Sequence, residues 1–273
     1  MNIGGRKFVY QRVGLILIGD ELLNGSRTDK HMAKAIELLK ARGMVLNWVR
    51  VIGDTKQEII DTLRQTIRTG DLVFIFGGIG ATPDDVTRAS AATAFELELT
   101  RHPEAQAIIE EQFGERAYPN RILMSDLPEG ALLIPNPINR VPGFKVEHHH
   151  FVPGFPNMSW PMIEWVLDTH YQHLFDDEPN VEWRWDILGV AESSLLDMMN
   201  ELLETFVEVG LSSLPSTERR GNLIDFGLKG PKKEVIKAAK WLEEKLDEMK
   251  ISYTFRTDGD TKKGDSNDRD LSS

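Results

Sequence analysis

Two short, uninterrupted apolar runs, each ending at a glycine, constrain the fold of this chain more than any other feature. Val13–Ile18 ends at Gly19, and Leu72–Phe76 ends at Gly77. A strand that is apolar at every position, rather than at alternate positions, is typical of a parallel sheet buried on both faces. We therefore expect an α/β protein with a mostly parallel sheet between two layers of helices.

Helical segments with apolar faces separate these runs. Apolar residues recur at helical spacing from 32 to 39 and from 59 to 67, with a strand predicted between them at residues 45–52. Thr55 with Glu58 has the pattern of a capping box at the start of the second helix. Strands that alternate with helices imply right-handed crossovers, and the ligands of such sheets bind beyond the carboxyl ends of the strands.

The rest of the chain predicts a change of architecture. The first part is completed by helices over residues 86–97, 104–116 and 158–171 and short strands at 132–134 and 151–152. After a polar linker at 176–180, a βαββαβ order typical of a small ferredoxin-like α+β unit is predicted over residues 181–190, 193–206, 209–214, 222–228, 231–249 and 251–255. We therefore expect domains over residues 1–175 and 181–256 and a disordered polar tail over 257–273.

Composition excludes several classes of function. The formal net charge of -11 argues against a general nucleic-acid binder, since phosphate backbones are bound by basic surfaces. The absence of cysteine excludes disulfides, thiolate metal sites and cysteine nucleophiles. No stretch approaches the roughly 20 apolar residues of a membrane span, and the first ten residues lack the apolar core of a secretory signal. We expect a cytoplasmic protein with neither a nucleic-acid nor a membrane partner.

The loop at residues 77–85, GGIGATPDD, is the most informative segment. Glycines between a buried strand and a helix let backbone N–H groups approach an anionic ligand, although the spacing is that of neither a Rossmann fingerprint nor a P-loop. Asp84 and Asp85 would repel a bare phosphate, so they indicate a magnesium ion between protein and phosphate, or hydrogen bonds to a ring N–H. In the alternative interpretation Thr82 caps the following helix, Pro83 occupies its first position and the acids complement its dipole.

Three motifs stand in an order that resembles a known family. They are GDELL at residues 19–23, GGIGATPDDVT at 77–87 and PGFPNM at 153–158. Over residues 10–175 the chain resembles the molybdopterin-binding domain family of MogA- and MoaB-like proteins. It is most similar to the amino-terminal domain of CinA-type competence/damage-inducible proteins, a likeness that Asn136 with residues 142–144 strengthens.

The resemblance implies a site for the phosphate of a nucleotide or pterin. In the glycine loop it implies ligand contacts from Gly77, Gly78, Gly80 and Thr82. The other ligand-binding residues that it implies are Glu21, Asn136, Pro153, Gly154 and Pro156. Asp85 and Asp84 are the implied catalytic acids, and Asp20 and Asp85 the implied ligands of magnesium or another divalent cation. From the residues alone, Asp20 and Glu21 also fit an exposed turn, and residues 153–156 a rigid structural turn.

Some positions depart from the family pattern. Ile79 stands where Leu or Thr is usual, His31 where Asn is usual and Val141 where Ala is usual. These departures bear on which ligand is bound and not on the fold.

We expect structural rather than ligand-binding roles for the clustered histidines and for three tryptophans. Residues 148–150 are all histidine, but alternate residues of a strand face opposite sides, so at most two of them could share a metal ion. No family motif matches them, and we expect histidines on the surface. We expect Trp183, Trp185 and Trp241 to pack in the core or on the sheet rather than to stack on nucleic-acid bases.

The resemblance implies three functions. The leading hypothesis is divalent-metal-dependent cleavage of a nucleotide diphosphate similar to ADP-ribose or FAD, with Asp85 and either Asp84 or Asp20 holding the metal. The first alternative is molybdopterin binding or adenylyl transfer in molybdenum cofactor biosynthesis, and the second is a non-catalytic nucleotide- or pterin-binding regulatory protein. The resemblance also implies a homodimer, and we expect the deamidase domain of many CinA-type proteins to be missing here.

Overall fold

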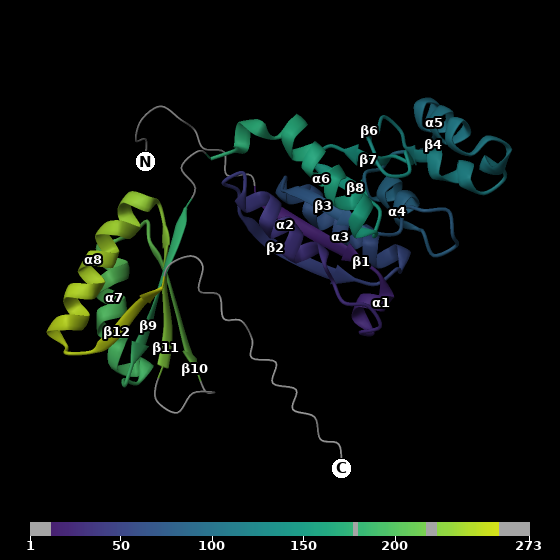
Figure 1. Cartoon of the computed structure of the whole chain (residues 1–273). Coiled ribbons are helices and arrows are strands. Elements are labelled where there is room, and N and C mark those ends of the chain that lie inside the picture. The colour runs from purple at the N-terminus through teal and green to yellow at the C-terminus, as the bar shows by residue number, and fades with distance from the viewer. Residues whose placement is uncertain (1–11, 177–179, 217–222, 257–273) are drawn as a thin grey trace, which may run out of the picture. The chain divides into compact units, whose positions relative to one another are not determined.

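The computed structural model describes residues 12–176, 180–216 and 223–256. The chain divides into two compact units, Met1–Asp176 and Asp177–Ser273, which Figure 1 shows in purple to teal and in green to yellow. This division falls within the linker that was expected at residues 176–180. Most of that linker and the expected tail over 257–273 lie outside the described residues, as does position 222, the start of one expected strand.

A six-stranded sheet forms the centre of the first unit. Its strands are β1 (Val13–Ile18), β2 (Leu46–Ile52), β3 (Leu72–Phe76), β6 (Leu132–Ile134), β7 (Gly143–Val146) and β8 (His149–Val152), in the order β2-β1-β3-β8-β7-β6. The pairs of β1 with β2, β1 with β3 and β3 with β8 are parallel, whereas β6, β7 and β8 pair antiparallel. The prediction of a mostly parallel sheet is confirmed.

Helices cover both faces of this sheet (Figure 1). Leu15 and Phe74 point toward helices α2 (His31–Lys40) and α6 (Pro156–His170), while their neighbours Ile16 and Ile75 point toward α3 (Lys56–Thr69) and α4 (Thr87–Ala94). All four side chains are at most 1% exposed. Because each such side chain contributes roughly 1.5–3 kcal/mol on burial, the two apolar layers hold the three-layer α/β/α arrangement together.

Several boundaries differ from those expected. Thr55 makes no side-chain hydrogen bond to α3, so the predicted capping box is wrong; the first turn of this helix is exposed, and water can satisfy its free N–H groups. Helix α4 ends at Ala94 rather than at residue 97, and Glu96 takes a positive φ of 59°. The small sheet of β4 (Leu99–Arg101) and β5 (Asp126–Pro128) was not predicted from the sequence; in the chain β4 precedes helix α5 (Pro103–Phe113) and β5 follows it.

The expectation of surface histidines is wrong for two of the three. His148 is exposed, but His149 and His150 are at most 1% exposed on β8. His149 contacts Thr66 of α3 and Phe95, whereas His150 lies against Tyr171 after α6 on the other face, so both faces of this strand are covered. A hydrogen bond of 2.8 Å joins His149 Nε2 to Thr66 Oγ1, and His150 Nδ1 donates to the carbonyl of Val73.

The second unit has the predicted order of elements. It comprises β9 (Val181–Leu188), α7 (Leu196–Thr205), β10 (Gly210–Ser216), β11 (Leu223–Gly230), α8 (Lys232–Glu248) and β12 (Ser252–Arg256), and its antiparallel sheet has the order β10-β11-β9-β12. Trp185 is fully buried in its core, with Trp183 and Trp241 packed against it, so the prediction that these tryptophans pack in the core or on the sheet is confirmed. This core shares no residue with the cores of the first unit.

Candidate functional site

The carboxyl ends of the four parallel strands of the first unit meet at a cavity of about 450 Å³. This is the edge of the sheet at which ligands were expected. Ten of the residues predicted from the sequence line the cavity, namely Glu21, Gly77, Gly78, Gly80, Thr82, Asp84, Asp85, Asn136, Pro153 and Gly154. Pro156 lines a second cavity of about 410 Å³, which shares Ile18, Glu21, Arg27 and Gly154 with the first. Asp20 lines neither of these cavities.

The first two glycines of the loop are required by its backbone. Gly77 has φ of 105° and Gly78 has φ of 66°, values that favour glycine. A Cβ atom on Gly77 would lie 2.5 Å from the carbonyl oxygen of Ile18, and one on Gly78 would lie 2.2 Å from Thr87 Oγ1. These glycines therefore let the chain turn tightly beneath the cavity.

Asp85 holds the end of the glycine loop in place through hydrogen bonds with Thr82. Its Oδ2 accepts hydrogen bonds from the backbone N–H of Thr82 at 2.9 Å and from Thr82 Oγ1 at 2.6 Å. A Cβ on Gly80 would lie 2.4 Å from the same oxygen, so the carboxylate packs directly against this glycine. Helix α4 begins only at Thr87, with Val86 at its N-cap position. The interpretation that Thr82 caps this helix is therefore wrong, because residues 82–85 form a separate turn.

Two carboxylates that follow neighbouring strands, β1 and β2, are paired through the backbone. Asp54 Oδ2 accepts from the N–H of Asp20 at 3.0 Å, and Asp20 Oδ1 accepts from the N–H of Asp54 at 3.2 Å. Partial burial raises the pKa of Asp54, and the charges of Asp20, Glu21 and Asp84 raise it further. Asp54 lines the cavity, although sequence reasoning did not select it. Its position after a strand, in a Gly-Asp pair that repeats Gly19-Asp20, could have revealed it.

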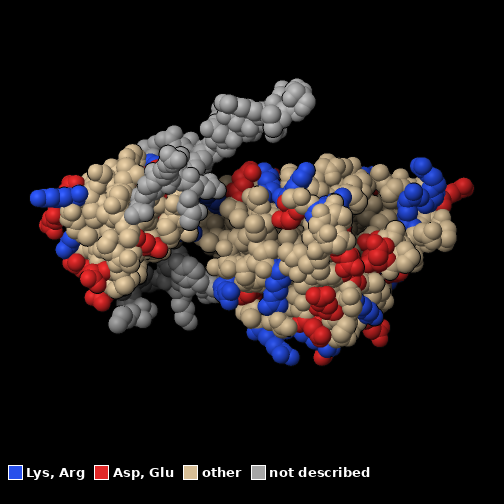
Figure 2. All heavy atoms as spheres, turned by 90° about the horizontal axis from the view of Figure 1, so that it is seen from below, with Lys and Arg blue, Asp and Glu red and all other residues tan. Residues whose placement is uncertain are grey.

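Acidic groups dominate the charge of the cavity. Glu21, Asp54, Asp84 and Asp85 line it, and Arg27 carries the only positive charge among the described lysines and arginines of its lining. Arg27 lies 3.3 Å from Glu21 Oε1. On the face of the first unit that Figure 2 shows, acidic and basic side chains are interspersed. A bound anion therefore depends on backbone N–H groups, on Arg27 or on a cation that accompanies it.

Asn136 supports the wall of the cavity through its own turn. Its side-chain oxygen accepts from the N–H of Ile138 at 3.0 Å, and its Nδ2 donates to Asn139 Oδ1 at 2.7 Å. Asn136 is 5% exposed. Its side chain therefore holds the segment at 136–141 in place, and Asn139, which sequence reasoning missed, also lines the cavity.

His31 connects helix α2 to the turn after β8 at the second cavity. Its ring lies against that of Phe76, with the centroids 4.3 Å apart, and its Nε2 donates to the carbonyl of Gly154 at 3.3 Å. Burial lowers the pKa of His31, which favours the neutral ring. Its Nδ1 has no hydrogen-bond partner in the described part of the chain.

Arg88 is a third residue that sequence reasoning missed, after Asp54 and Asn139. It lies on α4 and is 8% exposed. Its guanidinium donates to the carbonyl oxygens of Ile79 at 3.2 Å and Gly80 at 2.8 Å. Arg88 is the second residue of α4, and its local sequence gives no signal for this role, because the contact depends on how the loop folds back.

Comparison with known proteins decides the family. Residues 14–173 match the family model described as "Probable molybdopterin binding domain", which spans more than half of the chain. The chain belongs to the molybdopterin-binding domain family. The resemblance inferred from the three ordered motifs is therefore confirmed.

Relatives of this molybdopterin-binding domain carry CinA names. A CinA-like protein of Syntrophotalea carbinolica is 31% identical over 188 residues, which are 66% of this chain and 46% of the relative. A CinA-like protein of Escherichia coli O9:H4 is 29% identical over 245 residues, or 86% of this chain and 60% of the relative. The chain thus spans about half the length of the curated relatives it matches.

A solved structure agrees with the fold of the first unit. The crystal structure of the protein CinA with unknown function from Thermoplasma acidophilum is 26% identical, with a TM-score of 0.53. The match covers 58% of this chain and 98% of that chain. The α/β fold of the molybdopterin-binding unit is shown by this likeness.

The carboxylates that line the cavity are oxygen ligands of the kind that magnesium takes. Within residues 12–176, 180–216 and 223–256, no group of three or more His, Asp or Glu side chains is arranged to hold a metal ion. Magnesium is commonly held by only one or two carboxylates together with phosphate oxygens. Partial burial is the main cause of the raised pKa of Asp54, and the charges of Asp20, Glu21 and Asp84 raise it further, so a cation would stabilise the ionised form. Among the described helices, none has the length and apolar character of a membrane span.

Proposed function

We propose that the first unit binds a phosphate-bearing pterin of the molybdopterin type in the cavity at the carboxyl ends of β1, β2, β3 and β8. The description of the family supports the pterin. The observation that supports a phosphate is the glycine loop at residues 77–82, which lines the cavity and is held by the hydrogen bond from the N–H of Thr82 to Asp85. On this proposal the chain acts in the biosynthesis of the molybdenum cofactor, as a binding protein or an adenylyl transferase.

Two sets of lining residues would contact two different parts of the ligand, its phosphate and its ring system. Gly77, Gly78, Gly80 and Thr82 would contact the phosphate, and Arg27 would contribute the positive charge. The second cavity adjoins the first at Glu21 and Gly154, and it has space for a ring system beside His31. Magnesium, when bound with the phosphate, would offset the negative charge of the acids, and one or two of the carboxylates of Asp20, Asp54 and Asp85 would hold it together with phosphate oxygens.

A second candidate is hydrolysis of a nucleotide diphosphate such as ADP-ribose or FAD. The observation that favours it is the set of carboxylates that lines the cavity, because pterin binding alone does not require Glu21, Asp54, Asp84 and Asp85 together. In this reaction water adds across the P–O–P bond and releases two monophosphates. Asp84 and Asp85 would orient the reacting phosphate group, and the glycine loop would hold the other phosphate.

Binding and turnover measured on the full chain separate these functions. Molybdopterin is titrated anaerobically with and without magnesium, and ADP-ribose and FAD are tested for hydrolysis with magnesium, manganese and cobalt. Binding of the pterin without diphosphate hydrolysis supports the first proposal, and hydrolysis of either diphosphate supports the second. Binding of a nucleotide, with neither pterin binding nor any turnover, supports a regulatory protein. Failure to bind any of these ligands contradicts all three.

The expected homodimer and cytoplasmic location remain predictions. The homodimer follows from the resemblance, and light scattering of the full chain would test it. Because the chain spans about half of its curated relatives, activities of those whole proteins also come to it only as proposals.

A further inference from the structure

Arg88 is a buried cation that is bound by carbonyl groups. Besides the carbonyls of Ile79 and Gly80, its guanidinium donates to the carbonyl oxygen of Asp126 at 3.0 Å and to that of Leu123. Among the described residues it forms no ion pair with a carboxylate. Burial lowers the pKa of Arg88, but an arginine keeps its proton at neutral pH. The guanidinium of Arg88 therefore places a full positive charge against the carbonyl side of the glycine loop.

The bonds to Arg88 fix the direction of two peptide groups. In a planar trans peptide the C=O and the following N–H point in opposite directions. Because the oxygens of Ile79 and Gly80 point toward Arg88, the N–H groups of Gly80 and Ala81 point away from it. Both residues line the cavity, and within the described residues neither N–H has a hydrogen-bond partner.

We propose that Arg88 is a positioning residue that turns the N–H groups of Gly80 and Ala81 toward the phosphate of the ligand. This inference rests on the proposed function, since it assigns the donors that bind the phosphate in the same cavity. Two parallel N–H groups fit adjacent oxygens of a phosphate or pyrophosphate anion. The charge of Arg88 lies on the far side of the loop and also favours an anion, which Asp84 and Asp85 alone would repel.

The fork of the guanidinium explains why an arginine is needed. Four carbonyl groups surround Arg88, and its planar group of five N–H donors serves all four. A lysine would keep the charge, but its three donors leave at least one carbonyl without a partner. We therefore expect Arg88→Lys to keep most of the fold while it releases the peptide groups of the loop.

The test uses inorganic pyrophosphate with magnesium as the probe. The full chain is labelled with ¹⁵N, and the amide resonances of Gly80 and Ala81 are followed during the titration. These two resonances are expected to shift more than those of Gly77 and Gly78. Arg88→Lys should weaken pyrophosphate binding at least 10-fold. The matched control is Arg42→Lys, because the largely buried Arg42 also donates to a carbonyl, that of Leu38, outside the cavity, and this variant should bind pyrophosphate like the wild type.

The outcomes separate this inference from the function on which it rests. Tight pyrophosphate binding that leaves the Gly80 and Ala81 resonances unmoved overturns the inference, as does Arg88→Lys binding at the wild-type level. If Arg88→Lys does not fold, the shifts of the Gly80 and Ala81 amide resonances in the wild type still test the inference. Absence of pyrophosphate binding by the wild type overturns the phosphate site itself, whereas binding that depends on Arg88 without hydrolysis of any diphosphate contradicts only the second candidate function.

Discussion

Asp20 and Asp54 each accept a hydrogen bond from the backbone N–H of the other, at 3.2 and 3.0 Å. This reciprocal pair ties together the ends of β1 and β2 beside the cavity. It also keeps two carboxylates near each other, which is unfavourable when both are ionised. On the proposed function, a magnesium ion bound beside this pair would offset that repulsion.

Asp54→Asn separates ligand binding from folding. The pKa of Asp54 is raised in the folded state, so protonation of this carboxylate favours folding. The stability that the protonated group contributes is fully present at a pH below its usual pKa of 3.8, and it is lost as the pH rises through the pKa of the folded state. At pH 7 the ionised group opposes folding, and its replacement by Asn should leave the melting temperature unchanged or slightly higher. Magnesium-dependent binding of a phosphate ligand should fall at least 10-fold, or about 1.4 kcal/mol. A lower melting temperature with unchanged binding would make Asp54 purely structural.

Asp85→Asn tests the acid that holds the loop. The amide oxygen of Asn can still accept from Thr82, so the variant should lose only about 1 kcal/mol, the difference between a charged and a neutral acceptor. Metal-dependent binding or turnover should fall by about 10- to 1000-fold. Thr82→Val is the matched control, because it removes only the hydroxyl donor. Equal losses in the two variants would mean that Asp85 acts through the loop alone.

His149 should make the stability depend on pH. Burial, with a smaller effect of His148, lowers the pKa of His149 to about 4. The stability it contributes is therefore present above its ordinary value of 6.5 and is lost as the pH falls toward 4. We expect the wild type to lose about 3 kcal/mol more than His149→Gln between pH 7 and pH 4. Urea unfolding at several pH values measures this difference, and parallel curves for the two proteins would contradict it.

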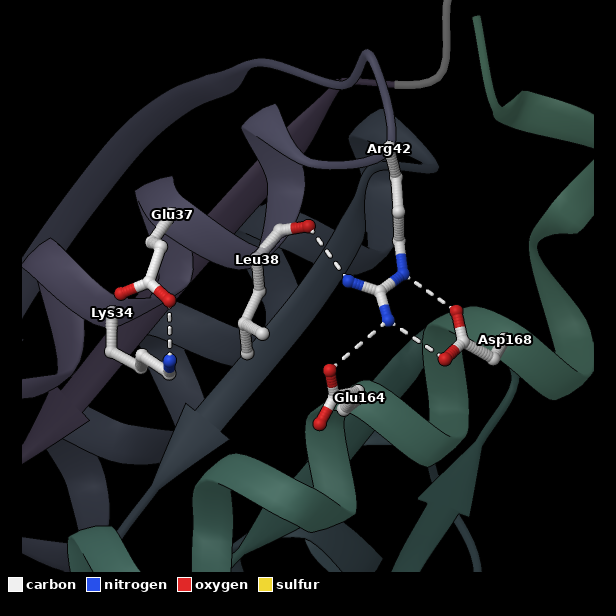
Figure 3. A network of polar contacts seen from close by, with 6 residues as sticks. All are labelled: Lys34, Glu37, Leu38, Arg42, Glu164 and Asp168. Atoms are coloured by element: carbon white, nitrogen blue, oxygen red, sulfur yellow. Dashed lines mark hydrogen bonds and ion pairs between the residues drawn. The ribbon is translucent and has the colours of Figure 1, made fainter. Parts of the chain in front are cut away.

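Arg42 joins the end of α2 to α6 (Figure 3). Its guanidinium donates to both carboxylate oxygens of Asp168, at 2.6 and 2.7 Å, and to the carbonyl of Leu38. Because the side chain of Arg42 is only 11% exposed, Arg42→Met should lower the stability by about 1 to 2 kcal/mol and leave ligand binding unchanged. Lys34→Met is the matched control, since the pair of Lys34 with Glu37 is more exposed and should contribute less than about 0.5 kcal/mol. Equal effects on the melting temperature would contradict this account.

The sequence predicted the features that depend on local pattern. The fully apolar runs at Val13–Ile18 and Leu72–Phe76 become central strands, and the glycine loop follows the second of them. The ordered motifs placed most of the expected residues in one cavity, because each follows a parallel strand and those strands end at one edge. Local pattern and parallel topology together were enough for this part of the site.

Features that depend on contacts between distant segments were not predicted. Arg88 binds carbonyls of Leu123 and Asp126, more than 30 residues away, and nothing in its local sequence marks this. The burial of His149 follows from Thr66 of α3 and from Phe95, which pack on this face of β8, and polar residues in a run of three suggested the surface instead. Pairing of Asp20 with Asp54 likewise requires β1 and β2 to be neighbours.

A crystal structure of the full chain grown anaerobically with molybdopterin and magnesium tests the central proposal most directly. The phosphate of the pterin is predicted to lie in the cavity against the glycine loop at residues 77–82, with the ring system toward His31. A phosphate bound anywhere else on the chain, with this cavity holding none of the ligand, would contradict the proposed site.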